Sequence, residues 1–204
     1  MTLKKDYELS SNSRFYLKDH GCMLINSIKW NTACSVEMFK LSKGARKILQ
    51  SRNAGGNSYR SEALSFDIAL NLIPGIELLK TETEIKYSSR RSKKTDYVIR
   101  VSDIYLGVSV TRAMCYFEHQ SFNKTDAYQM LYKKLKAVIS SNESNCGDPK
   151  FDRQILHVFV QSQEISELLQ EAYQSIEEEV KSNTIVLLTI TPEKGSDWLY
   201  YMIK

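Results

Sequence analysis

The sequence predicts an α/β protein in which a mixed sheet is flanked by helices on both faces. An amphipathic helix comes before an antiparallel run of strands, and two further helices then alternate with two apolar strands. Hydrophobic residues make up 42% of the chain, which is enough for a real core. Strand–helix–strand units pair their strands in parallel, and the connecting helices cover both faces of the sheet.

The first predicted helix runs from Ser58 to Leu72. Leu64, Ile68 and Leu72 recur every four residues, which places them on one side of a helix. Pro74-Gly75 follows and ends the helix, because proline cannot continue it and glycine permits a turn.

Three strands follow this helix. Residues 76–87 are the first of these strands, because from Leu79 to Tyr87 apolar or threonine side chains alternate with charged ones. Residues 88–94 form a basic turn, and residues 96–101 and 105–111 form the next hairpin. The pattern therefore predicts an antiparallel run of strands.

The C-terminal half alternates helices with buried strands. Thr125 is the expected N-cap of a helix that runs through Ile139, and residues 165–180 form an acidic amphipathic helix. Residues 154–160 and 183–191 are the two apolar strands that these helices connect.

Residues 1–57 are expected to form an N-terminal extension that packs on a core domain of residues 58–204. Within the extension, residues 22–30 have the composition of a strand, and residues 33–50 follow a loose helical pattern. The run Asn-Ala-Gly-Gly-Asn at 53–57 separates the two parts. One domain with an extension fits a chain of 204 residues.

Composition predicts a cytoplasmic or nuclear protein. The four cysteines are widely spaced and include no C-x-x-C pair, which indicates reduced thiols and argues against a zinc site. No apolar run approaches the ~20 residues that span a bilayer. The start of the chain also lacks an apolar signal segment, so we expect no association with a membrane.

Charge is unevenly distributed along the chain, although the net charge is only +4. Residues 1–60 hold eleven Lys and Arg against four Asp and Glu, whereas residues 161–204 hold three against eight. Such a dipole can orient a protein on a polyanion. Two differently solvated surfaces are the simpler interpretation of the same pattern.

Two carboxylates and two hydroxyls mark a candidate site. Asp96 opens the second predicted strand, and Glu62 lies in the first turns of the helix before the sheet. On the third strand, strict alternation places Ser109 and Thr111 on one face. We expect these four side chains to form a shallow polar site.

This order of elements, with acidic residues on the first helix and the second strand, resembles the PD-(D/E)xK restriction-endonuclease-like fold. The resemblance implies phosphodiester hydrolysis with Mg²⁺ or Mn²⁺ held by Glu62 and Asp96. Ser109 stands where such a nuclease carries its second acid, and Thr111 stands where it carries its lysine. The motif is therefore degenerate on its third strand.

Six short strings carry a second resemblance: Ser61-Glu62-Ala63-Leu64-Ser65-Phe66, Leu78-Leu79-Lys80-Thr81-Glu82, Thr95-Asp96-Tyr97-Val98, Gly107-Val108-Ser109-Val110-Thr111-Arg112-Ala113-Met114, Lys133-Lys134-Leu135 and Ile155-Leu156-His157-Val158. They resemble an uncharacterised eukaryotic family that includes the slime-mould AAC-rich mRNA clone proteins. The resemblance covers residues 58–191 and implies a fold more than an activity.

Basic side chains border the candidate site. They comprise Arg90, Arg91, Lys93 and Lys94 before the second strand, Arg112 at the end of the third, and Lys133, Lys134 and Lys136 on the helix that follows. These cations would bind DNA or RNA phosphates without reading sequence. Arg112 and Lys133 are also the two candidates for the missing lysine. Tyrosines that could stack on bases are Tyr87, Tyr97, Tyr105, Tyr128 and Tyr132.

A structural interpretation of the same residues stays open. Asp96 can hydrogen-bond its own turn, and Glu62 can complement the helix dipole. His157, on a buried strand, is expected to be a hydrogen-bonded core residue. The sequence thus predicts a nucleic-acid-engaging protein of nuclease-like fold, which is either a metal-dependent nuclease or an inactive module that binds nucleic acid or protein.

Overall fold

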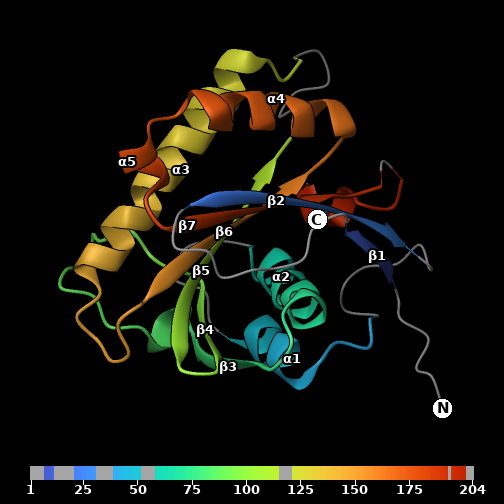
Figure 1. Ribbon diagram of the computed structural model, residues 1–204. Helices are drawn as coiled ribbons and strands as arrows, with labels where there is room; N and C mark the ends of the chain where they lie inside the picture. The colour runs from blue at the N-terminus through green and yellow to red at the C-terminus, as the bar shows by residue number, and fades with distance from the viewer. Residues whose placement is uncertain are drawn as a thin grey trace.

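A seven-stranded mixed sheet forms the centre of the protein (Figure 1). The computed structural model describes residues 7–11, 21–30, 39–51, 58–114, 121–192 and 194–200, and it describes residues 7–11 by their backbone alone. Across the sheet the strands lie in the order β1-β2-β7-β6-β5-β4-β3. Their bounds are Tyr7–Ser11 (β1), Cys22–Trp30 (β2), Ile76–Thr81 (β3), Tyr97–Val101 (β4), Ile104–Ala113 (β5), Arg153–Val160 (β6) and Thr184–Ile190 (β7).

Pairing within the sheet is both antiparallel and parallel. Strands β3, β4 and β5 pair antiparallel, whereas β5, β6, β7 and β2 pair in parallel. Strand β1 forms one edge of the sheet and pairs antiparallel with β2. The mixed α/β sheet that the sequence predicts is therefore confirmed.

Helices cover both faces of this sheet (Figure 1). Helices α1, Lys43–Gln50, and α2, Tyr59–Leu72, lie on one face. Helices α3, Lys124–Ser144, α4, Gln163–Ser175, and α5, Glu178–Lys181, lie on the other. From α2 onward the main elements follow the order that the sequence predicts: α2, β3, β4, β5, α3, β6, α4, β7.

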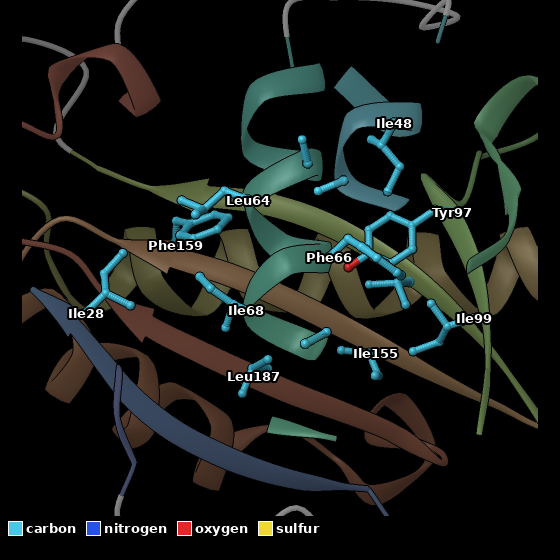
Figure 2. Close-up of a cluster of buried hydrophobic side chains, with 14 of the residues drawn as sticks. Ile28, Ile48, Leu64, Phe66, Ile68, Tyr97, Ile99, Ile155, Phe159 and Leu187 are labelled. Carbon is cyan, nitrogen blue, oxygen red and sulfur yellow. The ribbon is translucent and has the colours of Figure 1, made fainter. Parts of the chain in front are cut away.

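Helix α2 packs its apolar side onto the centre of the sheet (Figure 2). Leu64 and Ile68 are fully buried there, as the four-residue spacing predicts. Phe66 meets the ring of Tyr97 edge-on, with 5.9 Å between ring centroids. This packing fixes α2 over the sheet and so fixes the position of the residues at its N-terminal end.

The N-terminal part of the chain contributes to the same sheet. Strand β2 has the bounds 22–30 that the sequence predicts, and it lies beside β7. Helix α1 covers less of the chain than residues 33–50, because the Ser42 hydroxyl accepts the Ala45 N–H and caps the helix there. Residues 33–38 lie outside the described residues. The division into an extension of residues 1–57 and a core of residues 58–204 stays a prediction.

The strand predicted over residues 76–87 ends early. Strand β3 stops at Thr81, and a 3-10 turn occupies Glu82–Glu84. The Thr81 N–H and hydroxyl donate to the Glu84 carboxylate at 2.8 and 3.1 Å. This capping box satisfies the backbone locally, and the chain turns although the apolar alternation continues.

Two helix boundaries also differ from the prediction. Asn123, not Thr125, caps α3, because its side-chain oxygen accepts the N–H groups of Thr125 and Asp126 at 2.9 and 3.1 Å. The acidic helix predicted over residues 165–180 is interrupted at Ile176, which is extended and buried, so that α4 and α5 are separate helices.

Two short elements have no counterpart in the prediction. They are β1 and the four-residue helix α6, Asp197–Tyr200, whose Trp198 packs against Trp30 and Phe39. Nowhere in the described ranges is a helix both long and apolar enough to cross a membrane.

Candidate functional site

Asp96 lies immediately before β4, against the neighbouring strand β5. Its N–H donates to the Val108 carbonyl oxygen at 2.9 Å. One oxygen of its carboxylate accepts the Val110 N–H at 2.5 Å. The backbone of β5 therefore holds the Asp96 side chain in place, and this contact occupies one of its two carboxylate oxygens.

Glu62 approaches Asp96 from the first turn of α2, and its side chain is buried. Removal from water raises the pKa of the Asp96 carboxyl well above its usual range, and the negative charge of Glu62 raises it further. Glu82, also buried, adds to this repulsion, whereas the Val110 hydrogen bond opposes it. The fold thus gathers acidic groups that repel one another at the start of β4.

Lys134 is the cation that balances part of this charge. It lies on α3, half-buried, and its positive charge favours the ionised form of Asp96. Burial lowers the pKa of Lys134, the charge of Asp96 raises it, and nearby Lys133, Arg112 and Lys93 lower it. Lys134 is therefore an amine held between a carboxylate and a group of like charges.

Asp96 and Lys134 share a small pocket under α3. The pocket has a volume of about 200 Å³ and is lined by residues that include Asp96, Ser109, Lys93, Lys94, Lys133 and Lys134. Val138 and Leu156 supply apolar walls. Four lysines and one aspartate in so small a space favour an anionic ligand.

The basic loop before β4 is anchored to α3 at both ends. The Ser88 N–H donates to the Ser144 carbonyl oxygen at 2.9 Å, and the hydroxyls of Thr95 and Ser141 lie 2.9 Å apart. Next to Thr95, the ammonium of Lys94 lies 4.4 Å from the ring centroid of Tyr87. These contacts hold the loop lysines beside those of α3.

The other predicted phosphate-binding residues do not line this pocket. Arg90 and Arg91 are exposed on the loop, and Lys136 is exposed on α3. Arg112 is half-buried and donates to the Leu199 carbonyl oxygen at 3.0 Å. No ion pair joins any of the pocket lysines to a carboxylate within the part of the chain that the structure describes.

The remaining predicted site residues lie close to the pocket or outside it. Ser109 is half-buried and lines the pocket, whereas Thr111, two residues further along β5, is half-buried but does not line it. Tyr97 is fully buried and bonded to Ser65, so it cannot stack on a base. Lys133 and Arg112 were predicted as the candidates for the migrated lysine, whereas Lys134 is the cation whose charge favours the ionised form of Asp96.

The carboxylates at this site fit a divalent cation that keeps most of its water ligands. Among the described residues, no group of three or more His, Cys, Asp or Glu side chains is placed to hold a metal ion. The donors at hand are the Asp96 and Glu62 carboxylates, whose repulsion a cation would relieve. Magnesium accepts one or two carboxylates with waters in its remaining positions, so the pair fits Mg²⁺ or Mn²⁺.

His157 has the structural role that the sequence predicts. Its two ring nitrogens lie 2.7 Å from the hydroxyls of Ser65 and Thr189, and its ring stacks on Phe159. Burial lowers the pKa of His157 to about 3, so the ring is neutral at physiological pH. The prediction of a hydrogen-bonded core histidine is confirmed.

Comparison with known proteins adds one clear relative. No family model matches the chain. The chain is 35% identical over 191 residues to the AAC-rich mRNA clone AAC4 protein of Dictyostelium discoideum. This alignment covers 88% of the chain but only 27% of that protein, so the chain spans about a quarter of its relative. The similarity supports a family with that member.

One solved structure, Pyrococcus furiosus SfsA in complex with Ca²⁺, is also similar to this chain. The identity is 17%, the TM-score is 0.32, and the match covers 69% of each chain.

Proposed function

We propose that this protein binds nucleic acid at the Asp96 pocket and hydrolyses a phosphodiester bond there with Mg²⁺ or Mn²⁺. The observation that carries the proposal is Asp96, which lines a lysine-rich pocket together with Lys134 and is acted on by the charge of Glu62 from helix α2. Groups pushed away from their ordinary pKa by burial and by specific charges cluster at functional sites.

The lysines supply the part of the site that binds the substrate. Lys93, Lys94 and Lys133 surround the pocket on two elements that are tied together by Thr95 and Ser141. Their charges would neutralise backbone phosphates of DNA or RNA and bring a phosphodiester to Asp96. Arg90, Arg91, Arg112 and Lys136 would extend this binding surface beyond the pocket.

The acidic residues and Lys134 supply the chemistry. Asp96 and Glu62 would hold the divalent cation, which when bound activates water and neutralises the phosphate. The Val110 N–H fixes one Asp96 oxygen and leaves the other available to the cation. Lys134 would stabilise the negative charge that develops on the phosphoryl oxygens. Ser109 lines the pocket as a hydroxyl that can hydrogen-bond a water or a phosphate oxygen.

A cleavage assay on labelled single- and double-stranded DNA and RNA, with Mg²⁺ or Mn²⁺, tests the proposal. Asp96→Asn and Lys134→Met should each lower the cleavage rate by about 100-fold. Matched controls are Asp103→Asn and Lys86→Met, because both residues are exposed and lie outside the pocket. Metal-dependent cutting that survives Asp96→Asn would contradict the assignment of this site.

A catalytically inactive module that binds nucleic acid or protein is the second candidate. Two observations favour it: the Val110 N–H engages the Asp96 carboxylate, and hydroxyls stand at Ser109 and Thr111 in place of an acid and a lysine. It predicts no cutting with any metal, but binding that weakens steeply with salt. Asp96→Asn would leave that binding unchanged or make it tighter, because it removes a negative charge.

A further inference from the structure

A second and larger cavity lies on the opposite face of the sheet. It has a volume of about 880 Å³ and is lined by residues of α1, α2 and β3. Its apolar lining comes from Phe66, Leu70, Ile76 and Leu78. Among the described residues, Leu70 is the large hydrophobic side chain that stands exposed, at 39%. An apolar groove of this size is typical of a binding surface.

One rim of this groove is cationic. Lys43, Arg46 and Lys47 all line it and are exposed, and their spacing places them on one side of α1. Lys47 forms an ion pair with Glu84 at 2.9 Å, whereas Lys43 and Arg46 have no ion pair with a described carboxylate. The groove therefore offers two positive charges without an ion pair beside its apolar floor, although the Arg46 guanidinium also donates to the Leu41 carbonyl oxygen at 2.8 Å.

The other rim is the edge of the sheet. Strand β3 is the last strand in the order and pairs with β4 on one side alone. Ile76, Glu77 and Leu78 line the groove, and no described residue hydrogen-bonds the outer side of their backbone. The Glu77 carboxylate is neutralised by Arg100 at 2.6 Å. An unpaired strand edge is a template for an added strand.

We propose that this groove binds an extended acidic segment of a partner protein, which adds to β3 as a further strand. Its backbone would pair with residues 76–78, and the register shift after Leu78 would limit the pairing to this stretch. Alternate apolar side chains would cover Leu70 and Leu78, which are the accessible apolar residues of the lining, and carboxylates would meet Lys43 and Arg46. A nucleic acid would use the cations but would leave the apolar floor uncovered.

Two labelled peptides test the proposal on the full chain. The first alternates Glu with Leu over about 12 residues, and the second carries Lys in place of Glu. In fluorescence anisotropy the acidic peptide should bind at least about tenfold more tightly than the basic one. Both the double variant Lys43→Glu/Arg46→Glu and the single variant Leu70→Asp should weaken it by about tenfold. Lys194→Glu, an exposed charge reversal away from the groove, should change nothing.

Hydrogen exchange provides the readout that is specific for strand addition. Amides of residues 76–78 should exchange more slowly when the acidic peptide is bound. Equal binding of the two peptides, no binding up to about 1 mM, or binding that is unaffected by Leu70→Asp would overturn the proposal. Single-stranded DNA is the competing ligand. If it displaces the acidic peptide, and if its binding is weakened by Lys43→Glu/Arg46→Glu but unchanged by Leu70→Asp, the groove binds nucleic acid instead.

Discussion

His157 and Asp96 are both withdrawn from water, yet their surroundings differ. His157 is fully buried, both of its ring nitrogens meet hydroxyls at 2.7 Å, and its pKa is lowered to about 3 by burial alone. Asp96 is half-buried, and its pKa is raised by burial and by the charge of Glu62. One group is neutral with its hydrogen bonds made. The other is a carboxyl group that feels the like charges of Glu62 and Glu82 and the opposite charge of Lys134.

This difference separates a structural residue from a functional candidate. A buried polar group whose hydrogen bonds are all made stabilises one arrangement of the core. Carboxylates held together against their repulsion lower stability, and the fold recovers this cost only when a cation or another ligand binds. The comparison therefore predicts opposite responses to mutation at the two residues.

The largest effect is expected at the histidine. His157→Leu removes two hydrogen bonds and leaves the Thr189 hydroxyl buried without its partner. The free energy of unfolding should fall by about 3 kcal/mol, measured by urea denaturation at pH 7. Thr189→Val, which removes the hydroxyl itself, is the matched control and should cost about 1 kcal/mol. A His157→Leu protein as stable as wild type would show that the network adds nothing to the core.

Acidification should produce the next largest effect. The pKa of His157 is lowered to about 3 in the folded chain, so the unfolded chain binds the proton first as the pH falls below about 6.5. The contribution of His157 to the free energy of unfolding is complete above that pH and should fall by about 2 kcal/mol by pH 5. Asp96 acts with the opposite sign, because a raised pKa in the folded chain favours folding when the carboxyl becomes protonated.

The difference between two proteins isolates the histidine. The free energy of unfolding of wild type should drop more steeply from pH 7 to pH 5 than that of His157→Leu, by about 2 kcal/mol. Equal slopes would mean that the histidine is protonated or exposed in the folded chain at pH 5.

The smallest expected effect is at the carboxylate. Asp96→Asn removes the repulsion from Glu62, while the amide oxygen can still accept the Val110 N–H. The free energy of unfolding at pH 8 without added metal should therefore rise by about 1 kcal/mol. Mg²⁺ at millimolar concentration should stabilise wild type more than the variant. A loss of stability in Asp96→Asn would place Asp96 with His157 as a structural residue.

Periodicity predicted the parts of the fold that are set by burial. Leu64 and Ile68 indicate α2, and the apolar runs of β6 and β7 indicate strands that are covered on both faces. The end of β3 depends on a capping contact between Thr81 and Glu84, which competes with a strand pattern that continues beyond it. Short elements such as β1 and α6 form through pairing and packing with distant residues, which a local pattern does not contain.

The candidate site was predicted in part. Asp96, Glu62 and Ser109 follow from strand alternation and element order. Asp96 and Ser109 line one pocket, whereas Glu62 acts on Asp96 through its charge and does not line that pocket. Lys134 was placed among the phosphate-binding residues and not at the acids. The spacing of Lys134 in the sequence does indicate its position. It follows Leu131 by three residues and precedes Val138 by four, so it lies at the margin of the buried side of α3. The contribution of Glu82 depends on the turn after β3 and could not be read from alternation.

The parallel pairing of β2 with β7 joins a strand near the start of the chain to the last strand of the sheet. Cys22 lies opposite Ile185, so the two paired strands are synthesised at widely separated times. Until β7 is made, β2 has no partner on that side, and β6 is also an open edge. Contacts between such distant parts of a chain slow folding, and open strand edges favour aggregation. The pairing of the central sheet can therefore be completed only when nearly all of the described chain has been synthesised.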